Sequence, residues 1–309
     1  ELANPDIQDG KSFMGVSRGV VLGIEFDTEG MCWVLPAEKA DALYWQLKDM
    51  IKAGRSTSET FKSVVGKIIN LSSLIPMSRF HKGNVLNLYR EVQGKDAEEE
   101  MVLDEASLAE LGCWSMLVRM SKKAMPIPNV SGAPPPFATR IYTDAAGGDI
   151  KSSNGMGGVK VSWEGNLEDP FYLRWPEGIQ RGEVKSMCVL ELAAALGYVT
   201  CYAEKLRGKF VVVFIDNIAS ILAWRRGYSK SDEISSTLVK ALFFVCAACR
   251  ITLFTAHVPR CSNTESIIAD DLSKGIVDKH LLSIIGRDRI IGGWRWNRVP
   301  AHLCSWLEN

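Results

Sequence analysis

A proline-rich segment near the middle of the chain divides the sequence into two halves with different patterns. The stretch PIPNVSGAPPPFAT, residues 126–139, combines five prolines with glycine and serine. Because proline has no backbone N–H and a fixed φ, this stretch can continue neither a helix nor a central strand. We therefore predict two folded regions, 1–125 and 140–278, joined by an extended linker at 126–139 and followed by a basic and aromatic tail at 279–309.

The first half has the pattern of a β-hairpin followed by a helical bundle. Two β-rich runs within 19–36 flank a turn-like Asp-Thr-Glu-Gly cluster at 27–30. Apolar residues then recur at every third or fourth position, and the predicted helices cover 36–54, the residues from 56 onward, 78–92 and 104–121. We expect Gly54 to end the first of these helices, and Ser56 with Glu59 to form a capping box on the second.

The second half alternates strand and helix patterns. Strands are predicted at 139–148, 155–165, 171–176, 209–217 and 250–258, and helices at 184–206 and 235–249. The order is three strands, a helix, a strand, a helix and a strand. This order predicts an α/β layer architecture, with a mixed sheet flanked by helices.

Four carboxylates in the second half come from separate predicted elements. Asp144 lies in the first strand, Glu191 in the long helix, Asp216 at the end of the fourth strand, and Asp270 at the start of a C-terminal helical turn. Each alone has an ordinary explanation, since Asp216 and Asp270 could cap helices and Glu191 could reach solvent. Together they would repel one another unless Mg²⁺ or Mn²⁺ lay among them. Two such ions hydrolyse phosphodiesters, one generating the attacking hydroxide and the other stabilising the leaving 3′ oxygen.

The order and spacing of these acids resemble those of ribonuclease H. The acids stand in TDAAGG, LELAAAL, FIDN and ADDLSK, separated by 47, 25 and 54 positions (144 to 191, 191 to 216, 216 to 270). A transposase or integrase of this fold would present Asp, Asp, then Glu. A proofreading exonuclease would carry Asp-x-Glu on the first strand, where this chain has Asp144 followed by two alanines. The resemblance implies a ribonuclease H-like fold and a metal-dependent endonuclease that cleaves the RNA strand of RNA–DNA hybrids.

The stretch AHVPRCSNTESIIADDLSKG resembles the retroelement form of ribonuclease H, in which a His-x-Pro-Gly loop precedes Ala-Asp-x-Leu-Ser-Arg. The resemblance implies that Asp270 is the fourth metal ligand and that His257 assists proton movement or product release. A structural histidine at a strand end is the alternative for His257. Two departures from the family pattern stand out: Arg260 replaces the usual glycine, and the loop from His257 to Asp270 is longer.

The first half resembles the end of a reverse transcriptase palm, followed by its thumb and connection. The resemblance is carried by GVVLGIEFDTEG, WVLPAEKADAL and FKSVVGKIINLSSLIP. It implies a retroelement polyprotein of the DIRS type or a relative, or a domesticated copy. No Tyr-x-Asp-Asp occurs, so the polymerase metals would belong to an upstream part of the same polyprotein. The chain begins with Glu1 rather than Met, and we expect it to be a piece of a longer one.

Nucleic-acid contacts must come from local patches, because 36 basic and 36 acidic residues balance over the chain. Basic residues near aromatic ones can pair with phosphates while the aromatic rings stack on bases. The candidate contacts are Lys205, Arg207, Arg225, Arg226, Arg295 and Trp296. For the tail, a solvated or domain-packing segment is the alternative.

The remaining features bear on compartment and on a second class of function. Cys246 and Cys249 stand in an apolar stretch without a second ligand pair, so we predict a buried helix rather than a zinc site. No signal peptide is seen, and the longest apolar run, Ala241–Cys249, is too short for a bilayer. We expect no membrane partner and an intracellular protein, cytoplasmic or nuclear. The alternative function is a non-catalytic scaffold that binds protein or RNA.

Overall fold

The chain folds as two compact units, Glu1–Ser131 and Gly132–Asn309, whose division falls within the proline-rich segment. The computed structural model of the chain describes residues 17–21, 23–126, 133–147, 154–162, 164–175, 186–230 and 232–276. The predicted tail at 279–309, with Arg295 and Trp296, lies outside the described residues.

The first unit begins with an antiparallel sheet in the order β1-β2-β3-β6. Its strands are β1 (Arg18–Val21), β2 (Ile24–Asp27), β3 (Cys32–Val34) and β6 (Met125–Pro126). The predicted hairpin is the β2–β3 pair. The Asp27 carboxylate fixes its turn by accepting hydrogen bonds from the backbone N–H groups of Glu29 (3.0 Å) and Gly30 (2.8 Å).

A helical bundle follows, as predicted. Its elements are α1 (Ala37–Ala53), β4 (Arg55–Thr57), α2 (Ser58–Ser72), the 3₁₀ helix η1 (Pro76–His81), α3 (Gly83–Glu91), β5 (Glu100–Val102) and α4 (Glu105–Met120). Helix α1 ends at Gly54, which takes a left-handed φ of 65° as a glycine C-cap does. Its apolar face packs into a core that contains Phe61 and Trp114.

The predicted capping box on α2 is wrong. The N-cap is Thr57, whose side chain accepts a hydrogen bond from the N–H of Thr60 at 3.3 Å. Ser56 belongs instead to β4, where it pairs with Met101 on β5. This strand pairing keeps the backbone extended as far as Thr57, so the helix begins later than the sequence pattern indicated.

The second unit is a five-stranded mixed sheet flanked by helices, as predicted. The strands are β7 (Thr139–Ala145), β8 (Gly155–Val161), β9 (Leu167–Arg174), β10 (Phe210–Ile215) and β11 (Thr252–His257). Their order is β11-β10-β7-β8-β9, and β7, β10 and β11 run parallel while β8 is antiparallel to both of its neighbours. The parallel strands therefore bring their carboxyl ends to one edge of the sheet.

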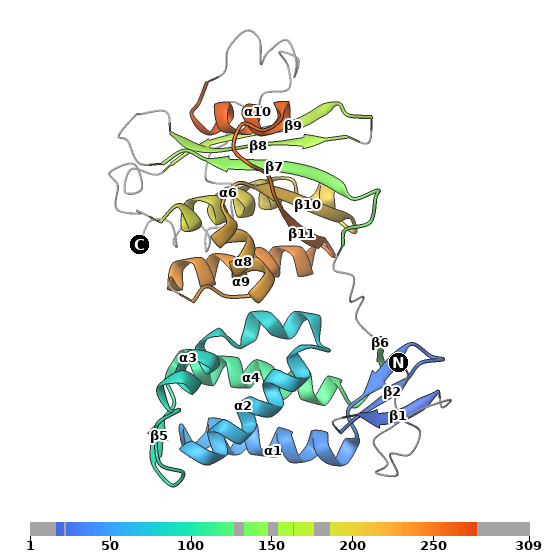
Figure 1. The fold of residues 1–309 in the computed structure, drawn as a ribbon, viewed down its shortest axis with the longest axis vertical. Coiled ribbons are helices and arrows are strands. Elements are labelled where there is room, and N and C mark those ends of the chain that lie inside the picture. The colour runs from blue at the N-terminus through green and yellow to red at the C-terminus, as the bar shows by residue number, and fades with distance from the viewer. Residues whose placement is uncertain are drawn as a thin grey trace, which may run out of the picture. The chain divides into compact units, whose positions relative to one another are not determined.

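Helices cover both faces of this sheet. They are α6 (Met187–Cys201), α7 (Ala203–Leu206), α8 (Ile218–Arg226), α9 (Glu233–Ala248) and α10 (Thr264–Ser273). Figure 1 shows α10 on one face and α6, α8 and α9 on the other. Cys246 in α9 and Cys249 at its end are buried, as predicted for an apolar helix. Within the described part of the chain, every helix is too short or too polar to cross a bilayer.

One glycine lets α10 lie directly on the sheet. Gly157 in β8 stands opposite Asp144 in β7. A Cβ at Gly157 would lie 2.3 Å from the backbone nitrogen of Ser273 and 2.5 Å from the carbonyl oxygen of Ala269, both in α10. The missing side chain therefore allows α10 to approach until its residues reach Asp144.

Candidate metal centre

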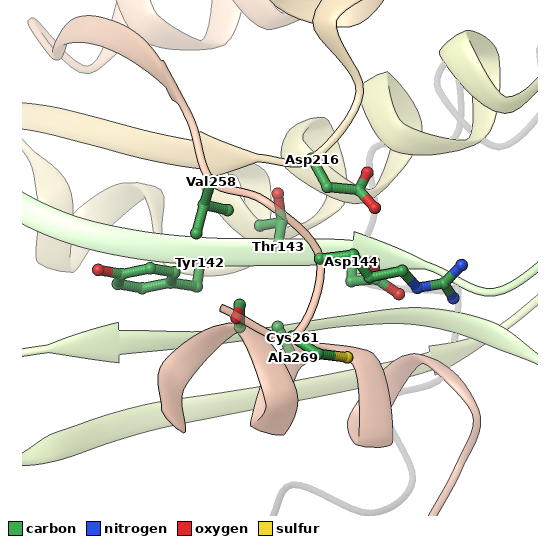
Figure 2. A pocket seen from close by; sticks show the side chains of 9 residues that line it. Tyr142, Thr143, Asp144, Asp216, Val258, Cys261 and Ala269 are labelled. Atoms are coloured by element: carbon green, nitrogen blue, oxygen red, sulfur yellow. The ribbon is translucent and has the colours of Figure 1, made fainter. Parts of the chain in front are cut away.

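Two aspartates lie at the carboxyl ends of the neighbouring strands β7 and β10. Tyr142 stands opposite Phe214 in the parallel register, and their rings stack with centroids 4.6 Å apart. Asp144 and Asp216 each come two positions later, so strand alternation places both on the face of the stacked rings. Figure 2 shows their carboxylates reaching the same end of a pocket, which Arg260 also lines.

A third carboxylate reaches this edge from α6. Glu191 is only 1% exposed, so the alternative that it points to solvent is wrong. One of its oxygens accepts a hydrogen bond from the backbone N–H of Ala145 at 3.2 Å, which ties the helix to the end of β7. Asp144, Glu191 and Asp216 each offer one oxygen, and these atoms all lie within 4.8 Å of one another.

The buried oxygens of this triad fit a divalent cation. The second oxygen of Glu191, Oε2, is buried and has no hydrogen-bond partner. A buried carboxylate oxygen without a donor costs about 1–3 kcal/mol or more, because its lost hydration is not replaced. A cation bound to the three carboxylates would compensate that loss, and an all-oxygen ligand set suits Mg²⁺ or Mn²⁺. The residues present therefore fit a divalent metal ion.

The electrostatics of the triad also favour a bound cation. Burial raises the pKa of Asp144 to about 6, against a lowering effect of the hydrogen bond that Ser273 Oγ donates to its Oδ2 at 2.7 Å. Burial, and then the charges of Asp144 and Asp216, raise the pKa of Glu191 well above its usual range. Three carboxylates in one place resist ionisation together, and a bound cation removes that resistance.

The fourth predicted ligand, Asp270, lies nearby but has different partners. Its carboxylate accepts a hydrogen bond from Arg260 at 2.9 Å and pairs with Lys274 in the next turn of α10. Burial opposes ionisation, but the two cationic partners outweigh it and lower the pKa of Asp270. Asp270 is not among the acids whose oxygens converge within 4.8 Å. Its role as a metal ligand stays a prediction.

The alternative that Asp216 and Asp270 cap helices is wrong. The N-cap of α8 is Asn217, which accepts a hydrogen bond from the N–H of Ser220 at 3.1 Å. The N-cap of α10 is Asn263, which forms a capping box with Ser266. The sequence pattern had placed Asp270 at the start of a helical turn. In the structure it lies inside α10, which begins at Thr264. Neither aspartate is needed for capping.

His257 lies beside the triad at the end of β11. Its side chain is exposed, and its Nε2 lies 3.1 Å from the backbone carbonyl oxygen of Asp216. Since a carbonyl oxygen only accepts, Nε2 is the donor in this contact. The contact places an imidazole next to the acidic cluster, and it also braces the backbone that carries Asp216. Its part in proton movement stays a prediction.

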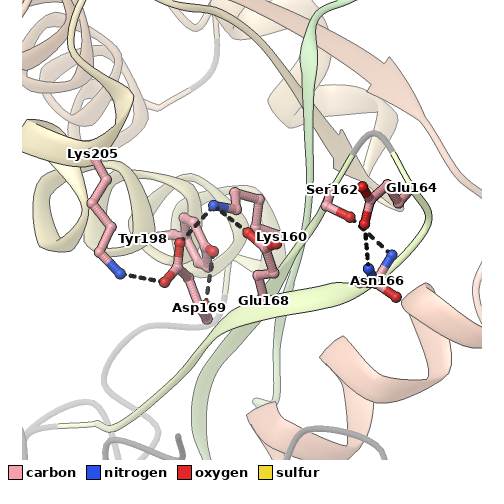
Figure 3. Close-up of polar contacts among 8 residues, drawn as sticks. All are labelled: Lys160, Ser162, Glu164, Asn166, Glu168, Asp169, Tyr198 and Lys205. Carbon is pink, nitrogen blue, oxygen red and sulfur yellow. Dashed lines mark hydrogen bonds and ion pairs between the residues drawn. The ribbon is translucent and has the colours of Figure 1, made fainter.

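Two of the predicted nucleic-acid contacts, Lys205 and Arg207, form ion pairs near the end of β10 that is opposite to the triad. Lys205 pairs with Asp169 at 2.5 Å, and Figure 3 shows Asp169 between Lys205 and Lys160. Arg207 pairs with Glu204 at 2.6 Å. Both residues precede β10, whereas Asp216 follows it. At about 3.3 Å per residue, the length of this strand separates them from the triad by roughly 20 Å.

The other predicted contacts differ in position. Arg225 and Arg226 are exposed in the last turn of α8, and Arg225 donates a hydrogen bond to the carbonyl oxygen of Thr255 at 3.2 Å. Arg295 and Trp296 lie outside the described residues. The contact of all four residues with nucleic acid stays a prediction.

Sequence reasoning missed two residues that contact the acids. Ser273 donates to Asp144, and Lys274 pairs with Asp270. Both follow Asp270 in the ADDLSKG stretch, at helical spacings that return them to the face of Asp270. The helical spacing of Ser273 and Lys274 from Asp270 could therefore have identified both residues, had the sequence shown that α10 continues through Ser273.

Comparisons with known proteins find similarity at the level of solved structures. No protein-family model matches the chain. No curated protein matches it either. Among solved structures it is similar to LC11-RNase H1, isolated from compost by a metagenomic approach, at 20% identity over 47% of this chain and 99% of that chain, with a TM-score of 0.36.

Two further solved structures are similar. The RNase H1 of the halophilic archaeon Halobacterium salinarum is 15% identical over 44% of this chain and 96% of that chain, with a TM-score of 0.32. LC11-RNase H1 in complex with an RNA/DNA hybrid is 19% identical over 46% of this chain and 99% of that chain, with a TM-score of 0.34.

Proposed function

We propose that the second unit is a metal-dependent endonuclease that cleaves the RNA strand of RNA–DNA hybrids. The observation that carries this proposal is the convergence of Asp144, Glu191 and Asp216, which each bring one oxygen within 4.8 Å of the others, together with a buried Glu191 oxygen that has no donor. An all-carboxylate site of this kind suits the hydrolysis of phosphodiesters, because carboxylates can hold the divalent ions that neutralise the phosphate charge.

The proposed reaction is a hydrolysis in which the residues of this chain have separate tasks. The oxygen of a water bonds to phosphorus, the bond from phosphorus to the 3′ oxygen breaks, and that oxygen takes a proton. The products are a 5′-phosphate and a 3′-hydroxyl. Asp144, Glu191 and Asp216 would hold a divalent ion, which would supply Lewis-acid activation of the water and neutralise phosphate charge. His257, exposed beside Asp216, offers an imidazole suited to moving a proton to or from solvent.

The choice of a hybrid substrate rests on the resemblance to ribonuclease H. The order of the acids supports it, and so does the combination of a mixed sheet with acids at the carboxyl ends of its parallel strands. A nuclease of this class would follow the sugar-phosphate backbone and the 2′-hydroxyls, so we expect little base specificity. A two-ion mechanism would also need Asp270, which pairs with Arg260 and Lys274 in the free protein.

The retroelement context is a further part of the proposal. It is supported by the resemblance of residues 14–125 to a reverse transcriptase palm end and thumb, and by the hairpin and helices of the first unit. Under this proposal an upstream polymerase part of the same polyprotein supplies the hybrid, because reverse transcription makes DNA on an RNA template.

The test is a cleavage assay on a hybrid whose RNA strand is labelled, in Mg²⁺ and separately in Mn²⁺. We expect cleavage of the RNA strand by the wild type and none by Asp144→Asn or Asp216→Asn. Glu233→Gln, an exposed acid in the first turn of α9, is the matched control and should cleave normally. Double-stranded DNA and double-stranded RNA of the same sequence test the substrate class. Folded wild-type protein that leaves the hybrid intact in both metals contradicts the proposal.

A non-catalytic scaffold is the second candidate. Two observations favour it: Asp270 is neutralised by Arg260 and Lys274, and Lys205 is engaged by Asp169. A scaffold would bind nucleic acid or protein with equal affinity in the wild type and in Asp144→Asn, and it would cleave nothing. Filter binding of the uncleaved hybrid to both proteins, in the presence of Ca²⁺, distinguishes the two functions.

A further inference from the structure

The loop after β11 places a cation beside the acidic triad. Arg260 lines the same pocket as Asp144 and Asp216. Its guanidinium donates to Oδ1 of Asp270 at 2.9 Å, and its side chain remains 60% exposed while that of Asp270 is 7% exposed. The guanidinium is therefore anchored on one side by a buried carboxylate and open to solvent on the other.

Asp270 is held by a second cation from its own helix. Lys274 pairs with its other oxygen, Oδ2, so each carboxylate oxygen of Asp270 has a cationic partner. A divalent ion would have to displace at least one of these partners before it could bind Asp270. Asp270 is nevertheless close enough to the triad that its charge raises the pKa of Asp144. The two cations thus already neutralise the carboxylate that would have to help hold a second ion.

The formal charges of the pocket balance with a single divalent ion. The four carboxylates of Asp144, Glu191, Asp216 and Asp270 are offset by Arg260, Lys274 and one doubly charged ion. A second divalent ion would leave the free site with an excess of positive charge, which desolvated surroundings disfavour.

We propose that Arg260, anchored by Asp270 and supported by Lys274, takes the place of one of two catalytic ions, so that the free protein binds a single divalent ion at Asp144, Glu191 and Asp216. The inference rests on the proposed function and deepens it. The exposed guanidinium then receives the scissile phosphate, since arginine binds phosphate oxygens through two parallel hydrogen bonds. Arg260 is thereby a catalytic residue that contacts substrate, and Lys274 is a positioning residue that acts through Asp270.

Ion counting tests the proposal without any nuclease assay. Mn²⁺ is titrated into the full chain without nucleic acid, and binding is followed by calorimetry and by the loss of the free-ion signal in electron paramagnetic resonance. We expect one ion for the wild type and one for Arg250→Ala. Arg250 is a matched control because it is exposed and precedes β11, at the end of the strand opposite to the pocket.

The double variant Arg260→Ala/Lys274→Ala should bind a second ion, because it leaves Asp270 without its two cationic partners. Adding Asp270→Asn to this variant should return the count to one, which assigns the second ion to Asp270. Thermal unfolding of each protein checks that the variants are folded. Two ions in the wild type, or one ion in the folded double variant, overturns the proposal.

Cleavage assays separate this proposal from the proposed function. In saturating Mg²⁺, Arg260→Ala should lower kcat/KM for the hybrid by about 10²-fold, the loss that follows removal of one preorganised donor to a transition-state charge. Arg260→Lys should recover part of it, since lysine keeps the charge without the fork. Cleavage by a wild type that binds two ions leaves the proposed function standing and refutes the role of Arg260. A wild type that binds one ion but cleaves no hybrid refutes the proposed function alone.

Discussion

The two units each bury a glutamate, and the two glutamates have different surroundings. Glu110 in α4 is 3% exposed, and Oε2 of its carboxylate accepts hydrogen bonds from the backbone N–H groups of Asn84 (2.9 Å) and Val85 (3.1 Å) at the start of α3. Glu191 in α6 is 1% exposed, and its Oε2 has no donor. The N-terminus of a helix supplies the positive end of a dipole and free N–H groups, so Glu110 is satisfied by the fold itself.

The difference separates a structural carboxylate from a functional one. Glu110 joins α4 to α3 and needs nothing further, whereas Glu191 stands beside Asp144 and Asp216 with one oxygen unsatisfied. A buried polar atom without a partner calls for a compensating group such as a bound ion or an ordered water. The contrast between Glu110 and Glu191 therefore supports the proposal that the chemistry lies in the second unit.

The largest expected effect concerns the activity of the triad. Glu191→Gln should reduce hybrid cleavage at least about 10³-fold, because charge stabilisation by a metal ion is worth several kcal/mol at the transition state. Glu110→Gln should leave kcat unchanged in the folded protein. Single-turnover cleavage of the hybrid by both variants, at equal folded concentration, measures the contrast. Equal losses of cleavage activity in Glu191→Gln and Glu110→Gln would contradict a special role for Glu191.

The next effect is on the stability of the metal-free protein. Asp144 has a pKa of about 6 in the folded chain and 3.8 as its ordinary value. The folded state therefore binds the extra proton between about pH 4 and 6, and stability falls as the pH rises through that window. At pH 8 without metal, Asp144→Asn should raise the free energy of unfolding by about 3 kcal/mol, because each pKa unit corresponds to about 1.36 kcal/mol.

Denaturant titrations of both proteins at pH 4 and pH 8, with a chelator present, measure this difference. The gain should fall to well under about 1 kcal/mol at pH 4, where Asp144 is protonated in the folded state and partly protonated in the unfolded state. Adding Mn²⁺ at pH 8 should stabilise the wild type and not Asp144→Asn, since only an intact triad gains by mass action. A variant that is less stable than the wild type at pH 8 would mean that the triad is not under electrostatic strain.

A smaller effect is expected from the glycine that lets α10 approach Asp144. Gly157→Ala places a Cβ 2.3 Å from the nitrogen of Ser273, so α10 must shift. Overpacking of this kind costs about 1–3 kcal/mol, and the shift should also weaken cleavage by moving Ser273 from Asp144. Gly66→Ala in α2 of the first unit meets nothing within 4 Å and should stabilise by about 0.5–1 kcal/mol. Thermal unfolding of both variants measures the expected loss of stability in Gly157→Ala and the expected gain in Gly66→Ala. Hybrid cleavage should weaken only in Gly157→Ala.

The fold followed from the sequence where local patterns decide it. Strand and helix patterns predicted the mixed sheet. Elements that are buried between layers are mostly apolar, as in the strand FVVVFI and the helix segment LELAAAL. The capping box at Ser56 failed because the pairing of β4 with β5, forty-odd residues apart in sequence, overrides a local signal. Helix starts depend on such partners, which no short window contains.

The candidate site was predictable in its residues but not in their pairing. Asp144, Glu191 and Asp216 could be selected because apolar neighbours make an acid conspicuous. The neutralisation of Asp270 could not be foreseen, because Arg260 reaches it only through the path of the loop after β11. Lys205 likewise was expected to meet nucleic acid, and its ion pair with Asp169 depends on the packing of α7 near β9.

The last predicted effect concerns Glu110, the buried glutamate of the first unit. Glu110→Gln keeps an acceptor for Asn84 and Val85 but removes the charge that strengthens both hydrogen bonds. We expect a loss of about 1 kcal/mol in the free energy of unfolding, unaffected by Mn²⁺, because backbone donors of the fold already satisfy the Glu110 carboxylate. Glu191→Gln should instead gain stability without metal and lose the response to Mn²⁺. Denaturant titrations with and without Mn²⁺ therefore test whether Glu110 stabilises the fold by itself and whether Glu191 depends on a bound ion.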